Sequence, residues 1–217
     1  MKTTREILKQ INNAIINNNK PRERKYLYAS DIYGCQRKIA MQFKGNQKSF
    51  DARTLRIFDN GNSTHERIEK YFLNAGMLIE SEKVLPNFVD EIEVHGRLDL
   101  LLKIDNEKVI GEIKSINLRN VETPKREHKA QLMFYMHQLN IKKGLLIYES
   151  KQTQELFLFE LDYDELKAKK VIDWFKETDK KMRQKRLPKK MNQNYYPCKF
   201  GKGECQYFED CHLNISL

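Results

Sequence analysis

The chain has 217 residues, of which 40% are hydrophobic and 32% charged, and its formal net charge is +10. This length and balance predict one globular domain over residues 1–217 and exclude a disordered chain. No apolar run is long enough to cross a membrane, and the polar N-terminal segment lacks the features of a secretory signal. We therefore expect no membrane span and a cytoplasmic location, in a host cell if a phage encodes the chain. The basic surface favours a polyanionic partner, most often nucleic acid.

The N-terminal third of the chain has helical periodicity. Residues 5–17 place Ile7, Leu8, Ile11 and Ile15 at helical spacing, which predicts an amphipathic helix. A second helix is expected from Ser30, as its N-cap, to Met41, and it would carry Cys35. A third is expected over residues 52–73, with Gly76 just past its end and Gly61 as a point where it could bend or break.

The period then changes to two. Residues 78–116 predict three strands, with turns at Pro86–Asn87 and Asp105–Asn106. A helix is expected over 125–139, strands over 144–149 and 155–161, and a long helix from Asp162, as its cap, to about residue 185. Because consecutive strands usually pair antiparallel, these elements predict an α/β fold with a mixed sheet flanked by helices.

Acidic and basic side chains interrupt two of the apolar strands. In the strand 91–101, Asp99 lies on the face opposite Leu98 and Leu100, and apolar residues follow it. In the next strand, Glu112 and Lys114 are two residues apart and share a face. Two carboxylates can bind Mg²⁺ or Mn²⁺, and a nearby lysine can hold a phosphate or assist the attacking water. The alternative is an ordinary Glu112–Lys114 ion pair on a solvated face.

The two motifs together resemble the PD-(D/E)XK nuclease superfamily. The matching residues are Gly96-Arg97-Leu98-Asp99 and Gly111-Glu112-Ile113-Lys114-Ser115. A helical histidine, His65 in GNSTHERIEKYF, and the pair Gln131 and Tyr135 in QLMFY are similar to the marks of its RecB-like branch. Leu98 departs from the superfamily pattern, which has proline there.

This resemblance implies a restriction-endonuclease-like fold and a role for each matching residue. His65, Asp99, Glu112 and the backbone carbonyl of Ile113 would bind the metal. Lys114 would assist the nucleophile or the phosphate, and Gln131 and Tyr135 would position the substrate from one helix face. Taken singly, residues such as His65, Gln131 and Tyr135 are more often ordinary residues of amphipathic helices, and their order and spacing around the two motifs carry the resemblance.

Four cysteines form a second pattern. Cys198, Cys205 and Cys211 lie close together in the tail, and Cys35 is remote in sequence. The pattern resembles the iron–sulfur RecB-like exonucleases, including the CRISPR-associated exonuclease family and its phage relatives. That resemblance implies a [4Fe–4S] cluster in a subregion of residues 1–50 and 187–217, around a catalytic core of residues 51–186. Zinc and four unligated thiols are the alternatives, although the spacing is wider than in the C-x-x-C knuckles of structural zinc sites.

Residues 180–190 contain seven basic side chains, and five aromatic residues follow (Tyr195, Tyr196, Phe200, Tyr207 and Phe208). This combination favours single-stranded DNA, although a basic run can also be a solvated face. The resulting prediction is a metal-dependent DNA exonuclease acting on single strands or DNA ends, with possible protein partners in recombination, repair or CRISPR adaptation. The alternatives are an endonuclease of the same superfamily and a non-catalytic DNA-binding subunit of a repair or adaptation complex.

Overall fold

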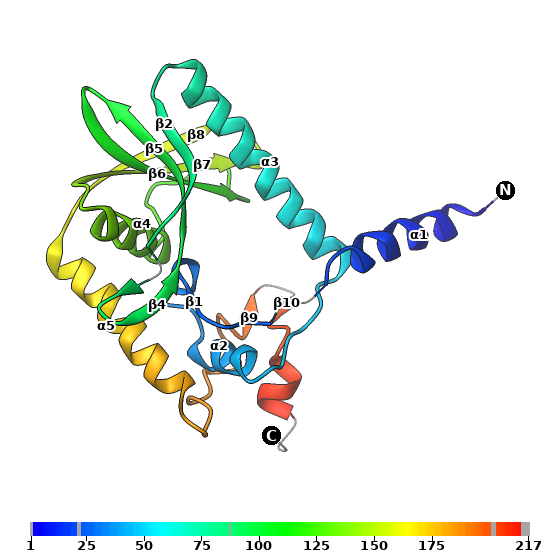
Figure 1. Cartoon of the computed structure of the whole chain (residues 1–217). Helices are drawn as coiled ribbons and strands as arrows, with labels where there is room; N and C mark the ends of the chain where they lie inside the picture. The colour runs from blue at the N-terminus through cyan, green and yellow to red at the C-terminus, as the bar shows by residue number, and fades with distance from the viewer. Residues whose placement is uncertain (1, 21–22, 87, 201–202, 214–217) are drawn as a thin grey trace. The chain divides into compact units, whose positions relative to one another are not determined.

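The computed structural model describes residues 2–20, 23–86, 88–200 and 203–213 (Figure 1). The chain forms two compact units. The sheet unit comprises residues 27–32 and 53–175, and the cysteine unit comprises residues 1–26, 33–52 and 176–217. No described helix has both the length and the apolar character needed to cross a membrane.

A five-stranded sheet forms the centre of the sheet unit. Its order is β2-β5-β6-β7-β8, in which β6 and β7 are parallel and the other neighbours antiparallel. The predicted mixed α/β fold is therefore confirmed. The strands are β2 (Leu78–Val84), β5 (Arg97–Ile104), β6 (Glu107–Ile116), β7 (Lys143–Ser150) and β8 (Leu156–Asp162).

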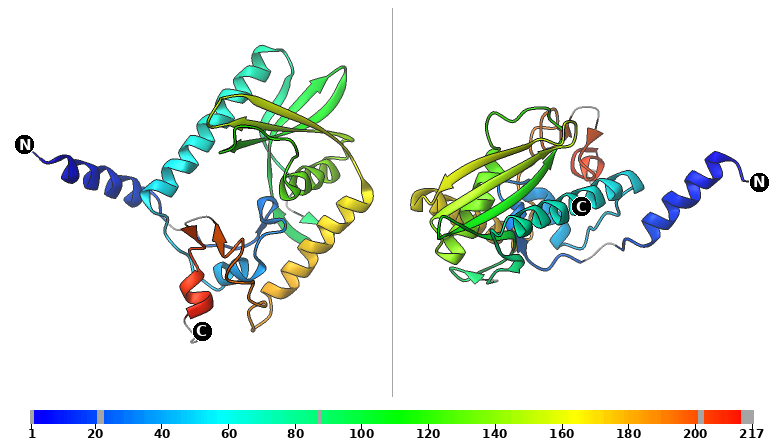
Figure 2. Two further views of the ribbon diagram at one scale, coloured as in Figure 1. Left: turned by 180° about the vertical axis from the view of Figure 1, so that it is seen from behind. Right: turned by 90° about the horizontal axis from the view of Figure 1, so that it is seen from above.

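Helices cover both faces of this sheet (Figure 2). On one face, Ile68 of α3 (Ala52–Asn74) packs in a buried cluster with strand residues that include Leu100 and Ile113. On the other, α4 (Arg126–Leu139) lies so close that a Cβ on Gly144 would be 2.8 Å from the sulfur of Met136. The charged residues of β6 that alternate with Ile113 consequently face α4.

The turns and breaks of the sheet unit only partly follow the sequence. The predicted turn at Asp105 and Asn106 joins β5 to β6, and both residues have positive φ, 48° and 67°. Helix α3 continues through Gly61 without a break. The turn predicted at Pro86–Asn87 includes Asn87, which lies outside the described residues.

The strand predicted over 91–101 is wrong as a single element. The chain divides at Gly96 into β4 (Ile92–His95) and β5. Strand β4 joins a separate small sheet with β1 (Leu27–Tyr28) and β3 (Phe88–Val89). At Gly96 a Cβ would lie 3.1 Å from the Tyr135 ring and 3.2 Å from Leu85, so a larger residue would crowd this break.

The cysteine unit contains α1 (Thr4–Asn17), α2 (Gln36–Phe43), β9 (Lys199–Phe200), β10 (Gly203–Glu204) and η2 (Glu209–Leu213). The helix predicted from Ser30 to Met41 is wrong in its first half. Residues 29–31 form one 3₁₀ turn, η1 (Ala29–Asp31), and Tyr33 has a left-handed φ of 58°, which interrupts a helix. Helix α2 starts at Gln36, so Cys35 is its N-cap.

The last long helix is shifted from its predicted position. Helix α5 spans Glu165–Met182, whereas Asp162 ends β8. Asp164 takes the capping role instead, because its Oδ1 accepts a hydrogen bond from the Lys167 amide at 3.0 Å. The helix ends at Met182, short of the predicted end near residue 185.

Candidate functional site

Asp99 lies where two central strands separate. The last paired residues of β5 and β6 on this side are Leu100 and Gly111. At the next residue of β5, a side chain takes the place of the main chain as the hydrogen-bond acceptor. The Asp99 Oδ2 accepts a hydrogen bond from the Ile113 amide of β6 at 2.7 Å. The carboxylate is thus fixed to the β6 main chain beside Glu112.

A hydrogen-bonded chain links four more of the predicted side chains. Lys114 Nζ donates to Glu112 Oε1 at 2.5 Å and to Gln131 Oε1 at 3.1 Å. Gln131 Nε2 in turn donates to the Tyr135 hydroxyl at 2.9 Å, across one turn of α4. Glu112 is only 1% exposed, so the alternative of an ion pair on a solvated face does not hold.

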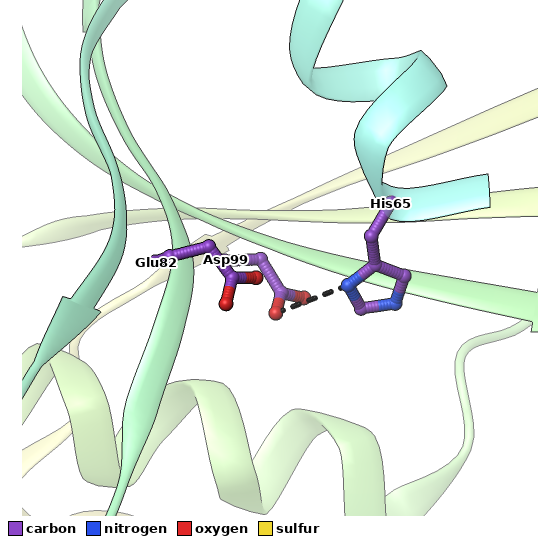
Figure 3. A group of neighbouring side chains, drawn as sticks. All are labelled: His65, Glu82 and Asp99. Carbon is purple, nitrogen blue, oxygen red and sulfur yellow. Dashed lines mark ion pairs between the residues drawn. The ribbon is translucent and has the colours of Figure 1, made fainter. Parts of the chain in front are cut away.

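His65 reaches the same place from α3. Its Nδ1 lies 3.3 Å from Asp99 Oδ1. One ligand atom each of His65, Asp99 and Glu82 lie within 4.8 Å of one another, and Figure 3 shows the three side chains pointing together from α3, β5 and β2. The six predicted side chains therefore form two bonded sets, His65 with Asp99 and Glu112 with Lys114, Gln131 and Tyr135. The two sets meet at the β6 main chain, where Asp99 accepts a hydrogen bond from the Ile113 amide.

Sequence reasoning missed Glu82. Glu82 has a left-handed φ of 53° inside β2, between residues that pair with Leu100 and Leu98. Its carboxylate also forms an ion pair with Arg97. Backbone strain of this kind gathers at functional sites. However, β2 carries several charged residues, and no sequence signal separates Glu82 from Glu80.

Burial sets the protonation of the central residues. Burial, with the negative charge of Asp99, raises the pKa of Glu112 to about 7. Burial disfavours the charged forms of Lys114 and His65, but the neighbouring carboxylates outweigh it and raise the pKa of both. Burial also raises the pKa of Tyr135, so its hydroxyl stays protonated.

One atom in this set is a buried acceptor without a partner. Glu112 Oε2 has no hydrogen bond within the described residues. An ionised carboxylate oxygen left this way is costly unless a cation or donor compensates it. The His65, Glu82 and Asp99 donors form a set that fits a hard divalent cation, and Glu112 lies outside this trio, next to the Ile113 amide that binds Asp99.

The site opens into a cavity of about 700 Å³. Its walls come from η1, α3, the strands β2, β4 and β5, and α4. The polar lining residues are Tyr28, Ser30, Asn62, His65, Glu66, Glu69, Glu82, His95, Arg97, Asp99, Gln131 and Tyr135.

The expected four-cysteine cluster is not confirmed. All four cysteines are free thiols in the cysteine unit, yet among the described residues no three of their sulfur atoms lie within 4.8 Å of one another. Burial raises the pKa of Cys198, and the charges of Cys35, Cys211 and Cys205 raise it further. His212 Nε2 lies 3.4 Å from Cys198 Sγ.

Comparison with known proteins agrees with this geometry. Residues 63–156 match the PD-(D/E)XK nuclease superfamily, a segment that contains all six predicted side chains of the metal and catalytic set. Residues 63–156 therefore carry the pattern of the PD-(D/E)XK nuclease superfamily, which confirms the superfamily inferred from the sequence. A comparison with curated proteins found no match.

Solved structures show the same fold. The crystal structure of SSO0001 is 16% identical with a TM-score of 0.55, covering 82% of this chain and 88% of that chain. The alkaline exonuclease LHK-Exo from Laribacter hongkongensis is 12% identical with a TM-score of 0.56, covering 78% and 92%. The structure of LHK-Exo in complex with dAMP is 14% identical with a TM-score of 0.56, covering 72% of this chain and 87% of that chain. At these identities the likeness shows the fold alone.

Proposed function

We propose that the chain is a deoxyribonuclease that requires Mg²⁺ or Mn²⁺ and acts as an exonuclease on single strands or DNA ends. The observation that carries this proposal is the buried, unpartnered oxygen of Glu112 beside Asp99 and Lys114. A buried carboxylate oxygen without a partner destabilises the fold, and a bound cation would compensate this cost.

Each residue of the site has a role that its contacts support. His65, Asp99 and Glu112 would hold the metal with the Ile113 carbonyl, and Glu82 is close enough to join them. When bound, the cation would lower the pKa of the attacking water and stabilise charge on the phosphate. Lys114, protonated and fixed by Glu112 and Gln131, would hold the water or a phosphate oxygen.

The helix α4 would position the substrate. Gln131 and Tyr135 both line the cavity and bind each other, so they present a fixed amide and hydroxyl to a ligand there. LHK-Exo, which has a similar fold, is an exonuclease, and by analogy with it we propose the exonuclease rather than the endonuclease.

Digestion of three substrates tests the proposal. Linear single strands labelled at one end, linear duplexes and closed circular single strands would be incubated with Mg²⁺ or Mn²⁺, and with EDTA. We expect degradation of linear strands from an end, no cutting of circles, and no activity in EDTA. Cutting of circles would indicate the endonuclease. Binding without any cutting would indicate a non-catalytic subunit and overturn the proposal.

We further propose that the four cysteines bind a [4Fe–4S] cluster in residues 1–50 and 187–217. A single zinc ion would hold thiolate sulfurs about 3.8 Å apart, given tetrahedral bonds of about 2.3 Å. In a four-iron cluster each thiolate binds a different iron atom, so the sulfurs lie further apart. All four thiols belong to one unit of the fold, which supports a shared site, and the sulfur spacing of the loaded protein would separate the two metals. Iron and sulfide analysis of anaerobically purified protein tests this, and stoichiometric zinc without iron would overturn it.

A further inference from the structure

A basic groove of about 990 Å³ lies within the cysteine unit. Helix α2 lines one side, and the end of α5 with residues 184–190 lines the other. Seven of its twelve lining residues are Lys or Arg, and none is Asp or Glu. None of the twelve belongs to the metal and catalytic set of the sheet unit.

Specific hydrogen bonds shape this groove. Arg37 Nη1 donates to the Pro188 carbonyl at 2.8 Å, and Lys44 Nζ donates to the Lys185 carbonyl at 3.0 Å. Both side chains therefore join α2 to the segment that follows α5. The groove is a folded feature rather than a gap between mobile lysines.

Four basic side chains of the groove form no ion pair in the described residues and are therefore available to bind a ligand. Lys185, Arg186, Lys189 and Lys190 are exposed, and none forms an ion pair with an acidic group in the part of the chain that the structure describes. Arg183 differs, because Asp179 binds it at 2.7 Å and it does not line the groove. Four unpaired positive charges in one concave surface attract a polyanion.

We propose that this groove binds the phosphate backbone of a single DNA strand. The choice of DNA as the polyanion rests on the proposed function. Two exposed rings favour a single strand: the chain leaving the groove at Lys190 reaches Tyr195 and Tyr196, which are 69% and 75% exposed. Unpaired bases stack on such rings, while bases within a duplex are already stacked.

The groove also adjoins the cysteines. Cys35 is the N-cap of α2, the helix that carries Arg37 and is followed by Lys44. In the tail, His212 Nε2 contacts the Cys198 sulfur at 3.4 Å. A group that tied Cys35 to the cysteines of the tail would therefore act on the helix that lines one side of the groove.

Neutralising the four unpaired cations tests the inference. The groove variant is Lys185→Ala, Arg186→Ala, Lys189→Ala and Lys190→Ala in the full chain. The control variant removes the same charge from exposed lysines of the sheet unit, as Lys103→Ala, Lys108→Ala, Lys169→Ala and Lys170→Ala. Binding of fluorescein-labelled dT15 would be measured by anisotropy in EDTA, over a range of KCl concentrations, with a duplex of the same length and polyglutamate as comparisons.

We expect the groove variant to bind dT15 more weakly, with a log–log salt slope smaller by about 0.7 per lost contact, or about 2.8 for four. The salt slope of the control variant should differ from that of the wild type by no more than about 0.7, the value for one phosphate contact. Equal slopes in wild type and groove variant would overturn the inference, as would a loss confined to the duplex or equal competition by polyglutamate. Failure of the wild type to cleave any DNA would refute the proposed function but leave these binding results to stand.

Discussion

The two units of the chain assemble their polar sites in different ways. In the sheet unit, hydrogen bonds made by the fold fix the site, from the Ile113 amide on Asp99 to the Tyr135 hydroxyl on Gln131. In the cysteine unit, no three of the four thiol sulfur atoms lie within 4.8 Å of one another in the described residues. The comparison indicates that hydrogen bonds of the fold organise the first site, while the geometry of the second would be set by the cluster proposed above.

The largest effect that would separate the two sites is on cleavage. Asp99→Asn keeps an acceptor for the Ile113 amide but removes a negative charge from the proposed metal site. We expect cleavage of single strands to fall by about 100- to 1000-fold, a typical loss for one transition-state contact. Affinity for dT15, measured by anisotropy in EDTA, should stay within about threefold because it comes from dispersed phosphate contacts.

The control for this variant is Asp105→Asn, an exposed residue of the β5–β6 turn whose left-handed φ asparagine accepts readily. It should cleave like the wild type. Wild-type cleavage by Asp99→Asn would remove Asp99 from the mechanism.

Stability is the next largest expected effect. Cys205→Ser should lose the visible colour of the cluster and lower the melting temperature, because the cluster would link Cys35 to the distant C-terminal tail. By analogy with a covalent cross-link of so long a span the loss is about 5 kcal/mol, or about 10–20 °C. Scanning calorimetry and absorption spectra of anaerobic samples would check this. Asp99→Asn should keep the colour, and an unchanged melting temperature in a colourless Cys205→Ser protein would contradict a structural role.

Metal binding should stabilise the sheet unit through its prearranged donors. At a Mn²⁺ concentration about 100 times its Kd, the stabilisation is about 2.7 kcal/mol, which corresponds to about 5–11 °C. Thermal unfolding with and without Mn²⁺ would show this shift in the wild type. Asp99→Asn should show little of it, and an equal shift in both proteins would place the metal elsewhere.

Glu82 should give the smallest effect. Glu82→Gln removes one donor of the His65, Glu82 and Asp99 group and leaves the others, so we expect Mn²⁺ affinity to fall by about tenfold, as for a supporting ligand. Isothermal titration would measure the affinity. Glu80→Gln, on the same strand and outside this group, is the matched control and should bind Mn²⁺ normally. Equal Mn²⁺ affinity in both variants would show that Glu82 does not bind the metal and only forms an ion pair with Arg97.

Much of the site could be predicted from the sequence because its residues follow local rules. Glu112 and Lys114 share a strand face, and Gln131 and Tyr135 share a helix face, so periodicity alone brings each pair together. The turn at Asp105 and Asn106 then places Asp99 beside Glu112.

The features that sequence reasoning missed depend on contacts between distant segments. At the break, Gly96 lies against the Tyr135 ring, which belongs to a helix far along the chain. Glu82 is defined by a strained backbone opposite Asp99, which no periodicity indicates. The groove requires α2 to meet residues 184–190, and the composition of the basic run could not show which cations Asp179 neutralises and which line the groove.

The most direct test of the central claim uses Glu112→Gln, with Glu107→Gln from the exposed end of the same strand as its control. Mn²⁺ binding by electron paramagnetic resonance and hydrolysis of thymidine 5′-p-nitrophenyl phosphate would be measured on the same samples. A neutral amide in place of the buried carboxylate should weaken Mn²⁺ binding at least about tenfold and hydrolysis about 100-fold or more, without lowering the melting temperature. Glu107→Gln should match the wild type. Wild-type Mn²⁺ binding and hydrolysis by Glu112→Gln would contradict the assignment of the buried Glu112 oxygen to the metal.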